Sequence, residues 1–239
     1  MQVKPDILST ESKKIQIEQM FDSISPKYDF LNRSLSLGID TIWRKRTINA
    51  LKSIHPKTIL DVATGTGDLA IEALKLNPEK VIGIDISEGM LSFGRQKLAK
   101  RKINNIVLEK GDSENINYPN NLFDAVTVAF GVRNFENLEK GLQEMNRVLR
   151  KDGMIAILEF SRPKAFPLKQ LYNFYFTKIL PKMGNTLSKN NNAYTYLPAS
   201  VNAFPDDADF LEIMSKCGYL NCKQNRFMFG ICTLYTGTK

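Results

Sequence analysis

From residue 58 onward, short runs of β-branched residues alternate with helical stretches, and this alternation most strongly constrains the fold. Strands are expected over residues 58–63, 80–86, 105–110, 123–130 and 153–160. Helices are expected between them over residues 69–76, 88–102 and 138–149. The strands are nearly continuously apolar, which is typical of a parallel sheet covered on both faces. The pattern therefore predicts a doubly wound α/β domain.

The segments on either side of this repeat complete the expected domain. Residues 1–57 look mostly helical, and residues 161–204 form a long aromatic excursion after the fifth strand. The end of the chain, residues 205–239, predicts one helix and two strands joined by a short turn, which favours an antiparallel hairpin at the sheet edge. We expect a single domain, 1–239, built on a seven-stranded, mostly parallel, Rossmann-like sheet. The helix and strands of its last part are expected over residues 206–216, 221–228 and 231–236.

The charge balance favours an anionic partner. With 33 Lys and Arg residues against 25 Asp and Glu, the 239-residue chain carries +8, which fits nucleic acid or an anionic membrane surface. No apolar run approaches the roughly 18 residues that span a bilayer, and the N-terminus lacks the apolar core of a secretory signal. The three cysteines, Cys217, Cys222 and Cys232, match no disulfide or zinc spacing. We expect a reducing cytoplasm and no metal site.

A glycine loop follows the first strand, in the sequence Asp61-Val62-Ala63-Thr64-Gly65-Thr66-Gly67-Asp68. Glycines at a strand-to-helix turn let the backbone approach a bound nucleotide or cofactor closely. Asp85 ends the second strand, where a carboxylate can accept both hydroxyls of a ribose. Asp112-Ser113 follows the third strand, where a side chain can meet an adenine amino group. The carboxyl ends of these strands therefore predict a site for an adenosine-containing ligand.

Two alternatives accompany this prediction. Any one of Asp61, Asp85 and Asp112 alone would more often be a helix cap or a turn residue than a ligand, but three at successive strand ends beside a glycine loop favour a site. The loop also satisfies the dinucleotide fingerprint Gly65-x-Gly67-x-x-Ala70. The choice is then between NAD and S-adenosylmethionine, and the terminal hairpin favours the latter, because a dinucleotide fold needs a second mononucleotide half.

Further motifs lie outside the loop. They are Phe21-Asp22-x-Ile24-x-x-x-Tyr28-Asp29-x-x-Asn32, Leu35-Ser36-x-Gly38, Trp43-Arg44, Phe130-Gly131-Val132-Arg133-Asn134, Glu144-Met145-x-Arg147-Val148-Leu149, Leu158-Glu159-Phe160-Ser161-x-Pro163 and Tyr194-x-Tyr196-Leu197. Together with the loop, Asp85, Met90-Leu91 and Gly94, they resemble the class I S-adenosylmethionine-dependent methyltransferases, and among these the ubiquinone/menaquinone biosynthesis C-methyltransferases. The resemblance runs from about Phe21 to Gly237.

Three positions depart from that family's pattern. Asp40 stands where the family often has His, which removes that residue as a base. Ala199 replaces a frequent acid, and Phe229 stands near a frequent glycine. These departures leave the cofactor assignment unchanged and affect the expected shape of the substrate pocket.

The resemblance implies methyl transfer from S-adenosylmethionine to a ring carbon of a polyprenylated quinol. Demethylmenaquinol is the favoured acceptor, the benzoquinol precursor of ubiquinone is the alternative, and an RNA or another small molecule comes third. Residues 1–57 then form a helical substrate cap, 58–160 the cofactor-binding core and 161–204 a substrate-covering insertion. The expected cofactor contacts are Asp61, Gly65, Thr66, Gly67, Asp85, Asp112 and Ser113.

The chemistry requires a group that favours the phenolate form of the quinol and accepts a ring proton. The only histidine, His55, precedes the first strand and lies away from the ligand edge. Arg133, just beyond the fourth strand, is a candidate to stabilise phenolate or hold a relay water, and an ion pair with a carboxylate is its alternative. Tyr28 and Asn134 are further catalytic candidates, and Asn32 is a candidate to orient the quinol oxygens.

The aromatic insertion suggests a cover over an isoprenoid tail. Tyr172 and Tyr175 lie on an apolar stripe at helical spacing and are candidate substrate contacts, with ordinary core packing as the alternative. Basic residues could dock on anionic lipid heads, although each alone reads as a solvated surface charge. These are Lys13, Lys14, Arg44, Lys45 and Arg46. We therefore expect a cytoplasmic protein with peripheral membrane contact, while its oligomeric state stays open.

Three rival functions are weaker. A nucleic-acid methyltransferase would explain the charge, but the fourth strand ends in Ala129-Phe130-Gly131 without the motif of amino-methylating enzymes, and no Pro-Cys dipeptide is present. An NAD-dependent oxidoreductase lacks a histidine for hydride-transfer chemistry and a second nucleotide half. A non-catalytic binding module is the weakest alternative, because the glycine loop and the carboxylates expected for a cofactor site are all present. We expect no nucleic acid partner.

Overall fold

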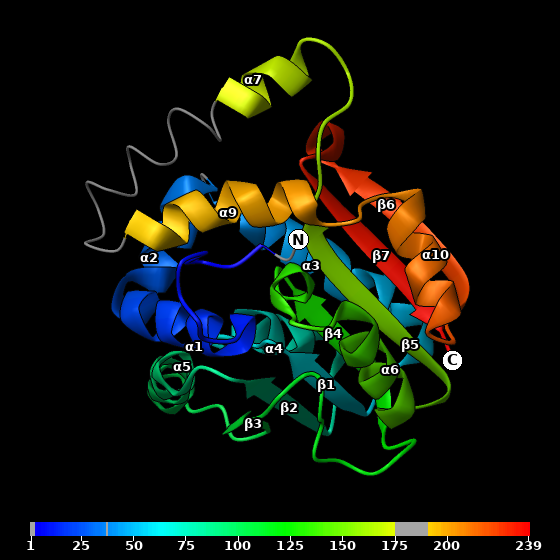
Figure 1. Cartoon of the computed structure of the whole chain (residues 1–239). Coiled ribbons are helices and arrows are strands. Elements are labelled where there is room, and N and C mark those ends of the chain that lie inside the picture. The colour runs from blue at the N-terminus through cyan, green and yellow to red at the C-terminus, as the bar shows by residue number, and fades with distance from the viewer. Residues whose placement is uncertain (1–2, 37, 175–190) are drawn as a thin grey trace.

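Strand β4 (Phe123–Ala129) is the middle strand of a seven-stranded sheet in a computed structural model that describes residues 3–36, 38–174 and 191–239. The strand order is β3-β2-β1-β4-β5-β7-β6 (Figure 1). β1 to β5 pair in parallel, and β7 lies antiparallel between β5 and β6. The sheet confirms the predicted class and terminal hairpin. The other strands are β1 (Thr58–Val62), β2 (Lys80–Asp85), β3 (Ile106–Lys110), β5 (Leu149–Phe160), β6 (Leu220–Phe227) and β7 (Cys232–Thr238).

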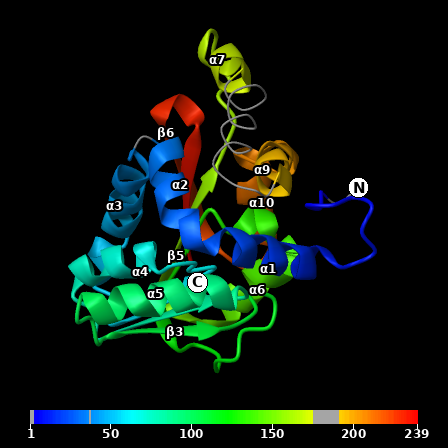
Figure 2. The same cartoon turned by 90° about the vertical axis from the view of Figure 1, so that its left-hand side faces the viewer.

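Helices cover both faces of the sheet (Figure 2). Helices α3 (Asp40–Ala50), α4 (Asp68–Ala73) and α5 (Glu88–Lys100) cover one face, and α6 (Leu138–Val148) and α10 (Ala208–Lys216) cover the other. Each face has its own apolar core, because successive residues of a strand point to opposite sides. In β1, Ile59 packs with the α3 and α4 core, whereas Leu60 packs with the α6 and α10 core. The single-turn helices are η1 (Ser25–Lys27), η2 (Lys52–Ile54), η3 (Leu74–Leu76), η4 (Val132–Asn134) and η6 (Met228–Gly230).

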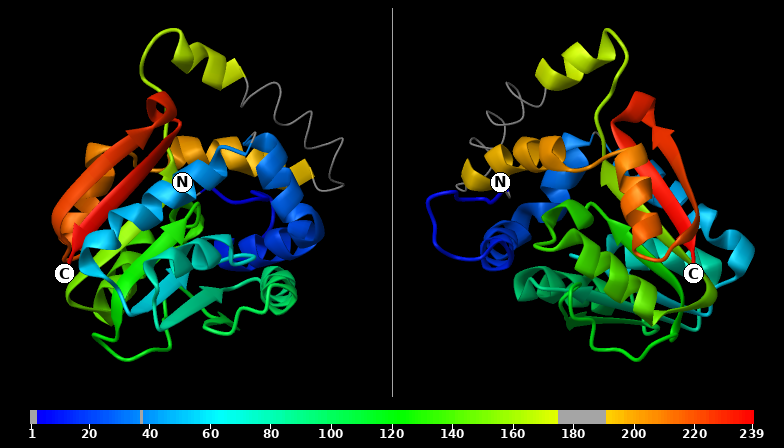
Figure 3. Two further views of the ribbon diagram at one scale, coloured as in Figure 1. Left: turned by 180° about the vertical axis from the view of Figure 1, so that it is seen from behind. Right: turned by 45° about the vertical axis from the view of Figure 1, so that its right-hand side comes forward.

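The N-terminal segment and the insertion lie at the carboxyl ends of the parallel strands. A small apolar cluster of Ile17, Met20, Leu31 and Tyr196 joins α1 (Lys13–Ile24), α2 (Tyr28–Leu35) and α9 (Asn191–Ala203). The ribbon of helix α7 (Leu168–Phe174) projects beyond the sheet in all views (Figures 1, 2 and 3), while its Tyr172 side chain is buried. No helix among residues 3–36, 38–174 and 191–239 is long and apolar enough to cross a membrane.

The fifth strand begins earlier than the sequence predicts. β5 starts at Leu149, where the apolar stripe of the preceding helix led us to expect helix through 149 and strand from 153. The cause is a sharp bend, because a Cβ at Gly153 would meet the carbonyl oxygens of Arg150 and Asp124 at 2.8 and 2.9 Å. Only glycine allows this approach, and it lets Leu149 pair with Phe123 of β4 before the register shifts.

Candidate active site

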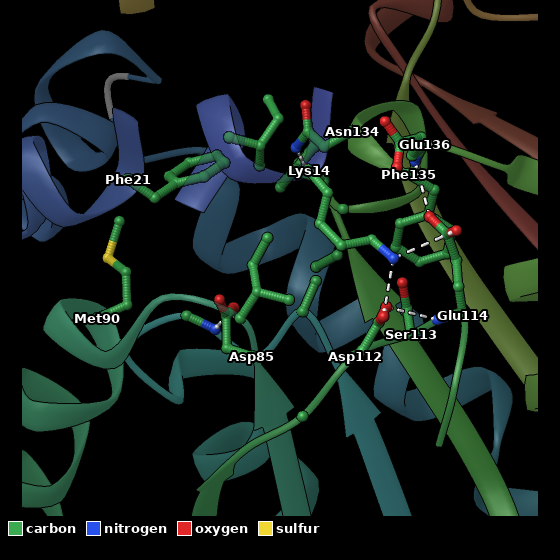
Figure 4. Close-up of a pocket in the computed structure, with 18 of the residues that line it drawn as sticks. Lys14, Phe21, Asp85, Met90, Asp112, Ser113, Glu114, Asn134, Phe135 and Glu136 are labelled. Carbon is green, nitrogen blue, oxygen red and sulfur yellow. Dashed lines mark hydrogen bonds and ion pairs between the residues drawn. The ribbon is translucent and has the colours of Figure 1, made fainter. Parts of the chain in front are cut away.

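A cleft of about 660 Å³ opens at the carboxyl ends of the strands, between the glycine loop and α1. Figure 4 shows side chains from four segments converging on it: Lys14 and Phe21 from α1, Asp85 at the end of β2, Asp112 beyond β3 and Asn134 beyond β4. This is the edge at which open α/β sheets bind ligands. Six of the predicted residues line it: Tyr28, Gly65, Asp85, Asp112, Ser113 and Asn134.

Unusual backbone conformations shape the walls of this cleft. Ala63 and Phe130, at the ends of β1 and β4, have positive φ angles of 52° and 58° although neither is glycine. Gly65, with φ 56°, continues the first of these turns. The two turns touch, because a Cβ on Gly131 would lie 2.6 Å from the Cβ of Ala63. Strain of this kind is retained where the surrounding structure enforces it, and it gathers at functional sites.

Asp85 ties the glycine loop to the second strand. Its Oδ2 accepts a hydrogen bond from the Gly65 amide at 2.8 Å, and its Oδ1 accepts one from the Ser87 amide at 2.9 Å. Burial raises the pKa of Asp85 to about 6, and these backbone donors act in the opposite direction. The backbone amide of Ile86 acts on the Asp85 carboxylate as well, and a carboxylate has about four acceptor positions, more than these three donors use. Asp85 therefore keeps acceptor capacity facing the cleft, as a ribose would require.

Asp61 is not among the residues that line the cleft, and its assignment as a cofactor contact stays a prediction. Its carboxylate is 1% exposed and accepts hydrogen bonds from Thr64 Oγ1 at 2.6 Å and Thr127 Oγ1 at 2.7 Å. Burial raises the pKa of Asp61 to about 6. Its position within β1, rather than beyond the strand, directs it beneath the loop. Asp61 supports the loop from below.

Lys14 closes the side of the cleft where adenine is expected. Its Nζ lies 2.8 Å from Asp112 Oδ2 and 3.4 Å from Glu114 Oε2, and Figure 4 marks both ion pairs with dashed lines. Glu114 is 5% exposed and its other oxygen accepts the amides of Glu136 and Asn137. Lys14 is thus held within the protein, which corrects its prediction as a lipid-facing charge.

Two more of the predicted lipid-facing charges are used internally. The Nζ of Lys13 donates to the carbonyl oxygens of Arg133 and Phe135 at 2.9 and 2.7 Å, and burial lowers its pKa to about 8. Arg44 pairs with Asp40 and, at 3.2 Å, with Asp68. These lysine and arginine side chains connect the N-terminal segment to the core. The prediction that they face lipid is therefore wrong. Lys45 and Arg46 remain exposed.

Arg133 forms an ion pair with a carboxylate, which was the alternative to its predicted role as a direct contact of the phenolate. Its Nη1 lies 2.8 Å from Oε1 of Glu159, and the two side chains are 8% and 0% exposed. The Glu159 carboxylate also accepts the amides of Arg133 and Phe160. Burial raises the pKa of Glu159, and the Arg133 charge opposes this shift. Arg133 does not line the cleft, so direct contact with a bound quinol is not supported.

Tyr28 and Asn134 both line the cleft. Burial raises the pKa of Tyr28, and a side-chain hydrogen bond with Asn32 lowers it. Asn32 does not line the cleft itself and acts on it through Tyr28. Asn134 is held by the hydroxyl of Tyr196, which donates to its Oδ1 at 3.2 Å. Both cleft residues therefore have side chains fixed by a second polar group.

The remaining predicted contacts lie elsewhere. Thr66 is 3% exposed and turns its hydroxyl to Asp29, and Gly67 caps the start of α4 with φ 81°. Neither lines the cleft, and nor does Tyr172, which is 8% exposed on α7. Tyr175 lies outside the described residues. In place of these, the structure brings residues to the cleft that the sequence did not single out as contacts: Lys14, Ile17, Phe21, Met90, Glu114, Phe130, Phe135 and Glu136.

Signals for three of these missed residues were present in the motifs. Phe21, Met90 and Phe130 belong to the quoted motifs at the start of the N-terminal segment, after β2 and after β4, and all three line the cleft. Lys14 and Glu136 had no such signal, because their partners lie far away in the sequence. Among the residues that the structure describes, no group of His, Cys, Asp and Glu side chains is arranged to hold a metal ion.

Comparison with known proteins places this geometry among methyltransferases. Residues 9–239 match the model of the ubiE/COQ5 methyltransferase family. The chain is 49% identical to a demethylmenaquinone methyltransferase of Bacteroides fragilis, over 99% of this chain and 97% of the relative. It is 43% identical to a ubiquinone/menaquinone biosynthesis C-methyltransferase UbiE of Geobacter sulfurreducens, over 94% and 88%. A crystal structure of a methyltransferase from Thermotoga maritima, titled a possible histamine N-methyltransferase, shares the fold with TM-score 0.64 and 18% identity, over 92% and 99%.

Proposed function

The chain belongs to the ubiE/COQ5 methyltransferase family, and from this membership we propose that it transfers the methyl group of S-adenosylmethionine to a ring carbon of demethylmenaquinol. The observation that carries the proposal is the cleft itself. Its lining combines the polar groups of Asp85, Asp112 and Ser113 with the aromatic side chains of Phe21 and Phe130. Polar groups suited to a nucleoside and aromatic surface suited to a quinol ring therefore line one cavity.

The residues present fit the cofactor. Asp85 offers free acceptor capacity for ribose hydroxyls beside the Gly65 turn, and no side chain at Gly65 narrows the approach. Asp112 is held in the cleft by Lys14 and offers an acceptor for an amino group. Bound there, the cofactor supplies an electrophilic methyl group on its sulfonium. The chain's task is then to align the quinol carbon with that methyl group and to exclude water.

Tyr28 and Asn134 are proposed to orient the quinol oxygens. Because burial raises the pKa of Tyr28, its hydroxyl stays protonated near neutral pH and acts as a donor. Asn134 accepts from Tyr196 on Oδ1 and donates from Nδ2 to the carbonyl oxygen of Phe130 at 3.4 Å, and the second N–H of Nδ2 is proposed to meet the other quinol oxygen. Phe21, Phe130 and Phe135 line the same cleft and are proposed to exclude water from the bound quinol. Fixed donors in a dry cavity stabilise charge that develops on a quinol oxygen.

Arg133 is proposed to favour the phenolate through space rather than by contact. Burial raises the pKa of Tyr28, Tyr172 and Tyr196, and the Arg133 charge lowers it in all three. A quinol is a phenol like tyrosine, so a quinol hydroxyl in the same surroundings experiences the same field. The negative charge of Glu159 reduces the effect of the Arg133 charge on the pKa of a nearby phenol, and its carboxylate holds the guanidinium in place.

The acceptor is assigned from the relatives. A protein 49% identical over 99% of this chain is named a demethylmenaquinone methyltransferase, and others more than 40% identical carry a name that includes both ubiquinone and menaquinone. The naphthoquinol is therefore the proposed substrate, and the benzoquinol precursor of ubiquinone is the second candidate.

A comparison of the reduced and oxidised forms of the acceptor tests the proposed reaction. Only the reduced form has ring carbons made nucleophilic by hydroxyl groups, so labelled methyl is expected in a reduced short-tail demethylnaphthoquinol and not in the matched quinone. Radiolabelled S-adenosylmethionine and chromatography of the products provide the measurement. Equal labelling of both forms would contradict the proposed chemistry.

Membrane contact is proposed at a surface other than the predicted basic residues. Helix α7 and η6 lie at the same end of the molecule (Figures 1 and 3). Exposed apolar side chains gather on these two segments and the chain leading to α7, and we call them the apolar end: Phe166, Leu171, Phe174, Met228 and Phe229, which are 81%, 61%, 59%, 42% and 74% exposed. Lys169 is exposed on the same stretch, and so is Lys164, whose Nζ also pairs with Asp207 at 2.6 Å. Apolar insertion with adjacent basic charge suits an anionic membrane surface, where a polyprenylated substrate resides.

Substitution of Phe229 by Ser is expected to weaken co-flotation with anionic vesicles roughly tenfold, since burial of a phenylalanine contributes about 1.5–3 kcal/mol. Leu220→Ser is the matched control, because Leu220 is 61% exposed at the far end of β6, roughly 25 Å away for an eight-residue strand. Both variants should bind S-adenosylmethionine like the wild type. Equal vesicle binding by the two variants would contradict this surface.

A further inference from the structure

The first turn of α2 rests directly on the glycine loop. The Tyr28 ring lies over Gly65, with its Cε1 3.9 Å from the position that a Cβ on Gly65 would occupy. The next residue, Asp29, accepts a hydrogen bond on Oδ1 from the hydroxyl of Thr66 at 2.6 Å. Two successive residues of α2 thus contact two successive residues of the loop. Helix and loop cannot shift independently without breaking these contacts.

Lys97 of α5 joins the same contact from the other side. Its Nζ lies 2.6 Å from Asp29 Oδ2, 2.7 Å from Asp68 Oδ1 and 3.0 Å from Thr66 Oγ1. One ammonium group therefore forms ion pairs with two carboxylates and also donates a hydrogen bond to the loop hydroxyl. The Lys97 side chain is 16% exposed, and a partly buried charge network is screened by salt less than an exposed pair.

Close packing fixes the helix that carries Lys97. A Cβ on Gly94, one turn before Lys97, would lie 3.1 Å from the backbone carbonyl of Thr66 and 2.5 Å from Leu108 Cδ1. The glycine lets α5 lie against the loop, and Gly94 and Lys97 share one face of the helix. The Thr66 hydroxyl is thereby held between an acid of the N-terminal segment and a base of the core.

The network connects the two proposed ligand positions. Gly65 and Asp85 line the cofactor side of the cleft, while Tyr28, hydrogen-bonded to Asn32, lines it from α2. Any change in the loop on cofactor binding is transmitted to α2 through Thr66 and Asp29. Because coupling between two sites is reciprocal, occupation of the quinol position then strengthens cofactor binding by the same factor.

We propose that Asp29 is a positioning residue that couples cofactor binding to quinol binding, by linking the Thr66 hydroxyl of the glycine loop to helix α2. The inference rests on the proposed function for the identity of the second ligand. It assigns no contact between Asp29 and either ligand. Asp29 acts through Thr66 on one side and through the first turn of α2 on the other.

The test measures the dissociation constant of S-adenosylhomocysteine by calorimetry, with and without a saturating oxidised short-tail demethylnaphthoquinone, which binds without reacting. In the wild type, the quinone is expected to tighten binding about tenfold, within the usual range of coupled sites. Asp29→Ala and Thr66→Val should reduce this factor to below about twofold. Thr66→Ser retains the hydroxyl and should keep the coupling factor at the wild-type value. A merely structural role of Thr66 would not explain that result.

Glu18→Ala is the matched control. Glu18 forms an ion pair with Lys110 at 2.7 Å, also between the N-terminal segment and the core, but away from the glycine loop. It should keep the wild-type coupling factor. Unchanged coupling in Asp29→Ala, or a wild type that binds both ligands without coupling, would overturn this inference and leave the methyl transfer intact. A wild type that binds S-adenosylhomocysteine but neither binds the quinone nor methylates the quinol would overturn the proposed function and this inference with it.

Discussion

Asp85→Ala is expected to weaken S-adenosylmethionine binding by about 100-fold or more. The carboxylate holds the Gly65 amide and is proposed to accept both ribose hydroxyls. Hydrogen bonds to a charged group contribute about 1.5–3 kcal/mol each, and each 1.4 kcal/mol corresponds to tenfold in affinity. Calorimetric titration of S-adenosylmethionine into the purified variant measures the effect, and thermal unfolding establishes that the variant is folded.

Glu88→Gln provides the control for this variant. Glu88 is a neighbouring acid in the first turn of α5, half-exposed and paired with Arg95, and its loss should leave the dissociation constant within about twofold. A pH dependence is also expected. The pKa of Asp85 is raised to about 6, so the acceptor carboxylate is lost by protonation and wild-type affinity falls as the pH drops below about 6. An Asp85→Ala variant with near wild-type affinity would exclude the ribose assignment.

Glu159→Ala is expected to lower the free energy of unfolding by roughly 3–5 kcal/mol, the range for removal of one member of a buried ion pair. Glu159 is 0% exposed and Arg133 is 8% exposed, so the substitution leaves a guanidinium charge without a counter-charge in the interior. The amide of Phe160 loses its acceptor as well. Urea denaturation followed by circular dichroism measures the loss.

The double substitution Arg133→Met with Glu159→Leu tests the cause of that loss. Replacement of both charges by apolar side chains of similar size is expected to recover most of the stability, since neither charge is then left buried alone. The same folded variant reports on Arg133, because methyl transfer should fall if its charge favours the phenolate. A loss below about 1 kcal/mol in Glu159→Ala would contradict the view that this pair is buried and essential to the fold.

The fold was largely predictable from local patterns. The apolar strands and intervening helices from residue 58 determine the parallel sheet, and the short final turn indicates its antiparallel edge. The start of β5 was wrong by four residues, because a bend that depends on Gly153 and on the distant Asp124 carbonyl does not show in a local apolar stripe. Boundaries set by contacts between strands are not encoded in one segment.

The site was predictable where backbone position alone decides it. Asp85 and Asp112 follow successive strands, and parallel strands bring their carboxyl ends to one edge. Asp61 lies inside β1, in register with Gly83 rather than with Asp85, so its carboxylate is buried two residues deeper in the sheet, beneath the loop. The prediction of lipid-facing charges failed for Lys13, Lys14 and Arg44. The sequence alone does not distinguish a basic side chain that faces solvent from one that is paired with a distant residue of the protein. Lys14 and Asp112, for example, lie 98 residues apart.

The measurement that tests the central claim most directly is transfer of labelled methyl from S-adenosylmethionine to three acceptors run side by side. They are a reduced short-tail demethylnaphthoquinol, a reduced benzoquinol precursor of ubiquinone, and bulk RNA. The proposed function predicts label on the ring of the naphthoquinol at the highest rate, less or none in the benzoquinol, and none in RNA. Label in RNA alone, by a protein that binds S-adenosylmethionine, would contradict the quinol assignment.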